Sequence, residues 1–98
     1  MQREDLVTKP NVRVASICLD PGEASPWHHH SMASEVVICL SGEIVVQVGA
    51  DGERIALSPG ERHDIALQER HRLIGSSKEP SSYLLVQDGS HDFVVEAD

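Results

Sequence analysis

The sequence is poor in aromatic residues, in cationic residues and in long apolar runs. Trp27, Tyr83 and Phe93 are the only aromatic side chains among 98 residues, so an apolar core must consist mainly of Val, Ile, Leu and Ala. Eight Lys and Arg residues stand against 16 Asp and Glu residues, which gives a formal net charge of −8. Because this charge would repel phosphate groups, we expect neither nucleic acid nor a membrane surface as a partner.

Membrane-spanning and secreted classes are disfavoured as well. No stretch approaches the roughly 18 apolar residues that a membrane span needs. Residues 1–5 are mostly polar or charged, with no apolar run behind them, so we expect no signal peptide and a cytoplasmic location. Cys18 and Cys39 lack Cys-x-x-Cys spacing and lie in apolar runs, which predicts reduced, buried thiols. Cys39 shares the strand parity of Glu35 and could line a cavity, although a core position is the preferred interpretation.

The length fits one domain, because two halves of this chain could not each bury a core. Turn-forming pairs recur at short intervals, and no window of eleven residues shows a helical period. Short runs rich in β-branched residues lie between the turns, which indicates an all-β sandwich or barrel. The expected strands are 12–19, 34–40, 43–48, 54–57, 72–74 and 83–86.

One of these runs, residues 35–40, is apolar on both faces after its first residue. A strand with one face in water would alternate apolar and polar residues, so something must cover the second face. In a short chain the preferred cover is a second subunit, which predicts a homodimer through Val36, Ile38 and Leu40. The alternative is an N-terminal edge strand of the same chain, formed around residues 5–7.

Three adjacent histidines, His28, His29 and His30, form the sharpest local feature. In a strand His28 and His30 point to one face and His29 to the other, and the first two could bind one metal ion together. Glu35 lies an odd number of positions after His30, so a continuous strand would place it on the wrong face. The small, polar residues 31–34 can break the strand and return Glu35 as a carboxylate ligand.

The spacing of these residues resembles the first motif of the cupin family, G-x5-H-x-H-x4-E-x6-G. Every fixed position is present, as Gly22, His28, His30, Glu35 and Gly42. The second motif, G-x5-P-x-G-x2-H-x3-N, matches only in part. It falls on Gly60, Ala66, Gln68, His71 and Gly75, so that Ala, Gln and Gly replace the family's Pro, Gly and Asn.

A rival register starts at Gly52 and makes His63 the fourth ligand instead of His71. We prefer His71 because the rival leaves few residues between the motifs and displaces the turn at 59–60. Of the other candidates, His29 is expected to face solvent or to contact a ligand, and His91 to be an exposed tail residue. Arg70 and Arg72 flank His71 with opposite parity and are expected to point outward.

The resemblance covers about residues 11–87, and we expect residues 1–98 to form a single domain with an N-terminal edge segment and a short C-terminal tail. It implies a cupin-type double-stranded β-helix, a jelly-roll β-barrel. It also implies one divalent transition metal ion (Fe, Mn, Ni, Zn, Co or Cu) on His28, His30, Glu35 and His71.

The favoured function is that of a metal-dependent enzyme acting on a small molecule, of the dioxygenase, decarboxylase or isomerase type. A non-catalytic module that binds metal or a small molecule is the alternative, and a barrel that has lost its metal is a third. Fold alone does not choose among them.

Overall fold

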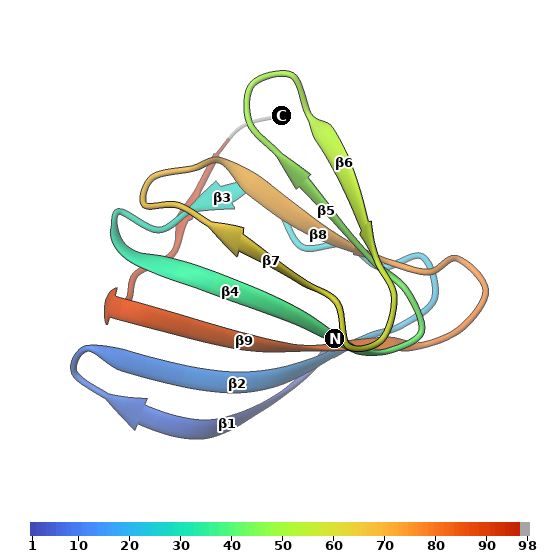
Figure 1. Ribbon diagram of the computed structural model, residues 1–98, viewed down its shortest axis with the longest axis horizontal. Helices are drawn as coiled ribbons and strands as arrows, with labels where there is room; N and C mark the ends of the chain where they lie inside the picture. Colours follow the sequence, from blue (N-terminus) through green and yellow to red (C-terminus); the bar gives the residue numbers. More distant parts are fainter. Residues whose placement is uncertain (97–98) are drawn as a thin grey trace.

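A computed structural model describes residues 1–96, which fold into two facing antiparallel β-sheets (Figure 1). No helix in these residues is long and apolar enough to cross a membrane. The strands of this range are β1 (Gln2–Lys9), β2 (Val12–Leu19), β3 (His28–His29), β4 (Met32–Ser41), β5 (Ile44–Val48), β6 (Glu53–Leu57), β7 (Arg62–Ile65), β8 (His71–Gly75), β9 (Ser81–Ser90) and β10 (Val94–Val95).

The first sheet has the order β1-β2-β9-β4-β7 and the second the order β10-β3-β8-β5-β6. From β2 onward the chain passes repeatedly from one sheet to the other, so strands distant in sequence become neighbours. This connection pattern is that of a double-stranded β-helix, or jelly roll, and the predicted fold class is confirmed. The sheets pack face to face rather than closing into one continuous hydrogen-bonded barrel.

All six predicted strands are present, and the run 12–19 coincides with β2. The expected edge segment around residues 5–7 belongs to β1, which pairs with β2. The sequence did not predict β3, β7 or β10. β7 is mostly polar (Arg62–Ile65), and it lies at a sheet edge, where charged residues are common and the alternation signal is weak.

The turn between β4 and β5 explains one glycine of the first motif. Gly42 has a φ of +71°, in the left-handed region that residues with a Cβ rarely adopt. A Cβ at this position would also collide with the side chain of Ser81. Gly42 therefore allows the chain to leave the first sheet and enter the second.

The space between the sheets is filled mainly by alternate residues of β2, β4, β5, β8 and β9. Most of these are aliphatic, and together with Cys39 and Tyr83 they form one buried cluster. Cys39 is thus a core residue, whereas Cys18 is only half-buried, so the prediction of two buried thiols is wrong for Cys18. Both thiols are free.

The outward face of β4 is partly open. Val36 and Ile38 are half-buried, and Leu40 is 47% exposed. β1 pairs with β2, and both β2 and β9 separate it from β4 in the sheet. The N-terminal segment therefore does not pair with β4, although Gln2, Arg3 and Glu4 line one pocket with Leu40, and the homodimer stays a prediction.

Candidate metal centre

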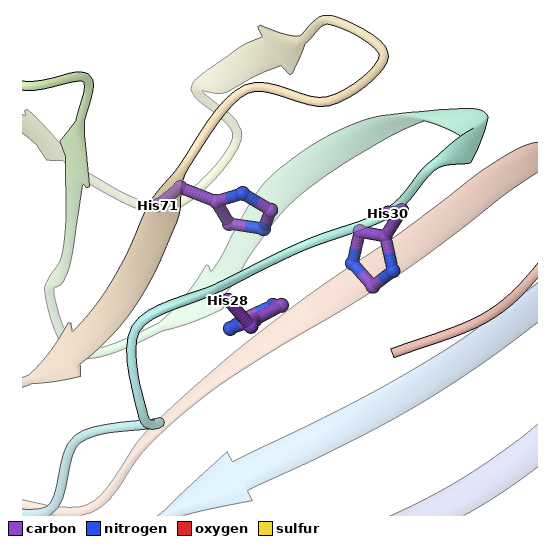
Figure 2. Close-up of side chains that lie close together, drawn as sticks. All are labelled: His28, His30 and His71. Carbon is purple, nitrogen blue, oxygen red and sulfur yellow. The ribbon is translucent and has the colours of Figure 1, made fainter. Parts of the chain in front are cut away.

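Three histidines from two strands and a crossing segment meet between the sheets (Figure 2). His28 in β3 lies directly opposite His71 at the start of β8. Opposed residues of an antiparallel pair share a face, so both rings point inward. His30 follows β3 at the point where the chain crosses to the first sheet, and β4 begins two residues later.

The three imidazoles can all reach one point. Each offers one ring nitrogen, and these nitrogens lie within 4.8 Å of one another. His28 and His30 are each 4% exposed and His71 is fully buried. Figure 2 shows the rings turned toward a common space.

Hydrogen bonds to backbone carbonyls orient these rings. Nδ1 of His28 donates to the carbonyl of Pro26 (2.8 Å), and Nδ1 of His71 donates to that of Glu69 (2.8 Å). Nδ1 of His30 donates to the carbonyl of Asp92. A carbonyl only accepts, so each Nδ1 carries the proton and a neutral ring keeps its lone pair on Nε2. Fixing the tautomer through the outer nitrogen is typical of metal-binding histidines.

Glu35 enters this cluster from the opposite sheet. Its Oε1 lies 3.1 Å from Nε2 of His30, and its Oε2 lies 3.2 Å from Nε2 of His71. Oε2 of Glu35 and Nε2 of His71 are buried and make no hydrogen bond. Two buried, unpartnered acceptors aimed at each other would repel unless a proton or a cation lies between them. The donor set therefore fits a divalent ion.

Strand geometry explains how Glu35 reaches the cluster despite its odd spacing from His30. Residues 30–31 lie outside any strand, and β4 starts at Met32. The predicted break between His30 and Glu35 is thus present, although it is shorter than the expected segment 31–34. Ala33, Glu35 and Val37 then alternate inward along β4.

The protonation states reflect burial and the single carboxylate. Burial, aided by neighbouring His71, lowers the pKa of His28 to about 4. For His30 burial also acts to lower the pKa, but Glu35 and the Asp92 carbonyl outweigh it and raise the pKa above its ordinary value. Burial would raise the pKa of Glu35, but the contacts with His30 and His71 lower it. The carboxylate is therefore ionised and able to neutralise a bound cation.

Gln87 of β9 is a further polar residue of the cluster that sequence reasoning missed. It is fully buried, and its Nε2 donates to Oε1 of Glu35 at 3.0 Å. It lies opposite Glu35 across the β4–β9 pair. The signal was available, because Gln87 has the inward parity of Tyr83 and Leu85 and is the polar member of that series.

The C-terminal segment covers the histidines. Besides the Asp92 carbonyl, the Asp92 carboxylate accepts hydrogen bonds from the backbone and hydroxyl of Ser31. The Phe93 ring stacks on His28 with centroids 4.3 Å apart. His91 is half-buried rather than exposed, so that expectation is wrong. No periodic pattern in residues 91–96 signalled this role.

Other candidate residues lie elsewhere. His63 is in β7 opposite Val37, outside the three-histidine cluster. His29 points to the other face, where its ring contacts the Glu96 carboxylate at 2.7 Å. Arg70 and Arg72 lie over the Trp27 ring, at 3.7 and 4.9 Å from its centroid, which agrees with the predicted outward direction.

Backbone geometry supports the register that contains His71. Gln68 is the residue that this register aligns with the second glycine of the motif, and its φ is +63°. It is the single non-glycine residue with positive φ in the chain as described, residues 1–96. The left-handed conformation thus persists where the glycine itself has been replaced.

A cavity of about 80 Å³ opens beside the cluster. Its walls include His28, His30 and Glu35, together with side chains from β1, β2 and β9. The candidate ligands thus face space that a small molecule could enter.

Three solved structures illustrate the similarity of the fold. The protein TT1209 from Thermus thermophilus is 27% identical, with a TM-score of 0.82 over 91% of this chain and 83% of that one. A Klebsiella pneumoniae protein with a double-stranded β-helix domain is 19% identical (TM-score 0.87; 99% and 84% covered). A putative mannose-6-phosphate isomerase from Ralstonia eutropha JMP134 is 23% identical (TM-score 0.79; 90% and 83% covered).

No curated protein matches the sequence. The family model of the cupin domain matches residues 15–87, a span that contains every fixed position of both motifs. On this match and the jelly-roll fold, the chain belongs to the cupin family.

Proposed function

We propose that the chain binds one divalent transition metal ion through His28, His30, Glu35 and His71. The observation that carries this proposal is the common orientation of the three rings, with each Nδ1 bound to a carbonyl. The unpartnered Oε2 of Glu35 and Nε2 of His71 add to it. Three nitrogens and a carboxylate oxygen suit Fe, Mn, Ni, Zn, Co or Cu, and the absence of thiolate leaves the choice to metal supply.

We further propose that the loaded protein is an enzyme acting on a small molecule, of the dioxygenase, decarboxylase or isomerase type. A bound ion would supply Lewis acidity and open positions for substrate. The chain's own part is to orient the imidazoles, hold Glu35 ionised and present a cavity beside them. The similar Ralstonia eutropha protein, a putative mannose-6-phosphate isomerase, agrees with one of these reaction types.

The alternative is a module that binds metal or a small molecule without turnover. It is favoured because the described residues that line the cavity include no acid–base pair outside the proposed ligands. Tyr83 also lines the cavity, but burial raises the pKa of its hydroxyl, so it stays protonated.

Elemental analysis of the purified protein tests the metal first. About one equivalent of one transition metal per chain is expected, and a protein that stays metal-free after incubation with each candidate ion would contradict the proposal. Turnover of small-molecule libraries by the loaded protein then separates enzyme from binding module. Isomerase activity requires no added oxidant, whereas dioxygenase activity requires O₂.

The same proposal includes a cytoplasmic homodimer with residues 1–98 as one domain. The outward face of the first sheet supports the dimer, because Val14, Val86 and Val36 lie side by side across β2, β9 and β4. Ile38 lies beside Leu84 in the next row of this face. Light scattering at micromolar concentration is expected to give the dimer mass, and Leu40→Asp to give the monomer. A monomer mass for the unaltered protein would contradict it.

A further inference from the structure

A row of three polar side chains crosses the inner face of the first sheet. Arg13 in β2 lies directly opposite Gln87 in β9, and Gln87 lies directly opposite Glu35 in β4. Opposed residues of antiparallel strands have Cβ atoms about 4.5–5.5 Å apart and share a face. Arg13 is therefore aligned with Glu35 at a distance of two strands, and Gln87 is between them.

The Arg13 side chain has an unsatisfied group. Its Nε is buried and makes no hydrogen bond. The residue is half-buried and lines the cavity that also touches His28 and Glu35. A buried donor without a partner is costly, and the cost is larger for a charged group. An acceptor from outside the chain would remove this cost.

The charges around Arg13 favour an anionic acceptor. A second arginine, Arg3, lines the same cavity, but its Nε already donates to Asp5 at 3.0 Å. Burial, and then the charge of Arg3, lower the pKa of Arg13, whereas Asp5 and Glu35 act in the opposite direction. Arginine stays protonated in proteins despite such shifts, so Arg13 remains a cation facing the cavity. Two arginines and one carboxylate, that of Glu35, thus line the cavity of a chain whose net charge is −8.

We propose that Arg13 binds the carboxylate of a small anionic substrate, whose other end reaches the metal. This inference rests on the proposed function and specifies its substrate class. The cavity of about 80 Å³ corresponds to roughly six water-sized positions, at about 10–15 Å³ each. A phosphate group would fill most of these positions. Too little space would then remain for the rest of the substrate to reach the metal ligands. A carboxylate matches the planar guanidinium fork with fewer atoms.

Isothermal titration with a matched pair of probes tests this assignment. The carboxylate probe is 3-hydroxypropionate, which carries a hydroxyl at its other end, and the neutral probe is 3-hydroxypropanamide. The metal-loaded protein should bind the carboxylate and bind the amide at least tenfold more weakly. Arg13→Met should weaken carboxylate binding about ten- to a hundredfold, as expected for hydrogen bonds to a charged group.

Two further variants control the comparison. Arg54→Met removes an exposed arginine of β6, on the other sheet, and should leave binding unchanged. Arg13→Lys keeps the charge but loses the paired geometry, so its affinity should be intermediate. If Arg13→Met does not fold, Arg13→Lys still tests the inference. Equal affinity of Arg13→Lys and the unaltered protein would then overturn it.

Metal content, measured on every sample, separates this inference from the proposed function. If metal is stoichiometric but Arg13→Met binds the carboxylate as tightly as the unaltered protein, only this inference fails. If no metal is taken up, the proposed function fails, and the titrations are repeated on the metal-free protein, where Arg13→Met must still weaken binding. Failure to bind the carboxylate, equal binding of the amide, or tighter binding of inorganic phosphate would each overturn the inference.

Discussion

The two ends of the space between the sheets differ in chemistry although the same strands build both. Along β8 the inward positions run from His71 through Leu73 to Gly75. Along β9 they run from Gln87 through Leu85 and Tyr83 to Ser81. One end is thus rich in titratable and amide groups, whereas at the other the buried Leu19, Ile44 and Leu57 pack beside Ser81 and Gly75.

This difference indicates that one end mainly stabilises the fold and that the other is suited to binding. Aliphatic residues such as Leu19 and Ile44 are fully buried, and their transfer from water stabilises the fold. The cluster of His28, His30, Glu35 and His71 is also buried, but it includes atoms without partners. Such groups are costly to the fold, which points to a ligand as the reason for their presence. Substitutions at the two ends should therefore separate stability from binding.

The largest effect is expected from His28→Ala combined with His30→Ala. This double variant removes two of the four proposed ligands, so stoichiometric metal should fall to none in elemental analysis. Because the apolar end is untouched, circular dichroism should still show the β-sheet fold. Unchanged metal content in the double variant would disprove the ligand assignment.

A large loss of stability, without loss of metal, is expected from Ile44→Ala at the apolar end. Ile44 is fully buried, so its truncation should lower the free energy of unfolding by about 2–5 kcal/mol in urea denaturation. Ile44→Val, the conservative control, should cost about 0.5–1.5 kcal/mol. If the folded Ile44→Ala variant failed to bind metal, the two ends would not be separable.

Acidification should weaken metal binding by at least tenfold between pH 7.5 and pH 5. Metal needs neutral imidazoles, and the raised pKa of His30 means that protonation of this ring competes with metal binding as the pH falls. His28, with its pKa lowered to about 4, should compete little in this range. The check is metal affinity measured by competition with a chelator of known pH dependence. A constant affinity would argue against a histidine site.

Gln87→Leu tests the amide that contacts Glu35. The loss of its hydrogen bond should weaken metal binding about tenfold, the lower end of the usual effect for groups that orient ligands. Asp88→Leu, at the exposed neighbour of Gln87 on the same strand, serves as a control for altered sheet stability. An affinity equal to that of the unaltered protein would show that Gln87 does not orient Glu35.

The smallest effect is expected from His63→Ala. His63 lies in edge strand β7, away from the three clustered rings. Metal affinity should change by less than about twofold, since the change removes no ligand or group that orients one. A large loss of metal affinity in this variant would favour His63 over His71 as the fourth ligand.

The parts of this molecule that obey a local rule could be predicted from the sequence. Runs of β-branched residues between turn signals placed β2 and β5, and motif spacing brought His28, His30 and Glu35 together. Residues whose position depends on distant partners could not be found in this way. β7 is polar and gains its place only by pairing with β4, and Asp92 orients His30 across 62 positions. The role proposed for Arg13 likewise depends on Gln87, its neighbour in the sheet, which the sequence does not reveal.

The order of strands in the first sheet has a consequence for synthesis on the ribosome. β9 (Ser81–Ser90) pairs with both β2 and β4, so that sheet stays divided until these residues emerge. Before then Glu35 and the three clustered histidines have been translated. The strand β9, which lies between β2 and β4 and carries Gln87, is not yet available. Long-range pairing of this kind slows folding. Metal uptake should therefore wait until β9 has left the ribosome, and a nascent-chain arrest upstream of β9 should block it.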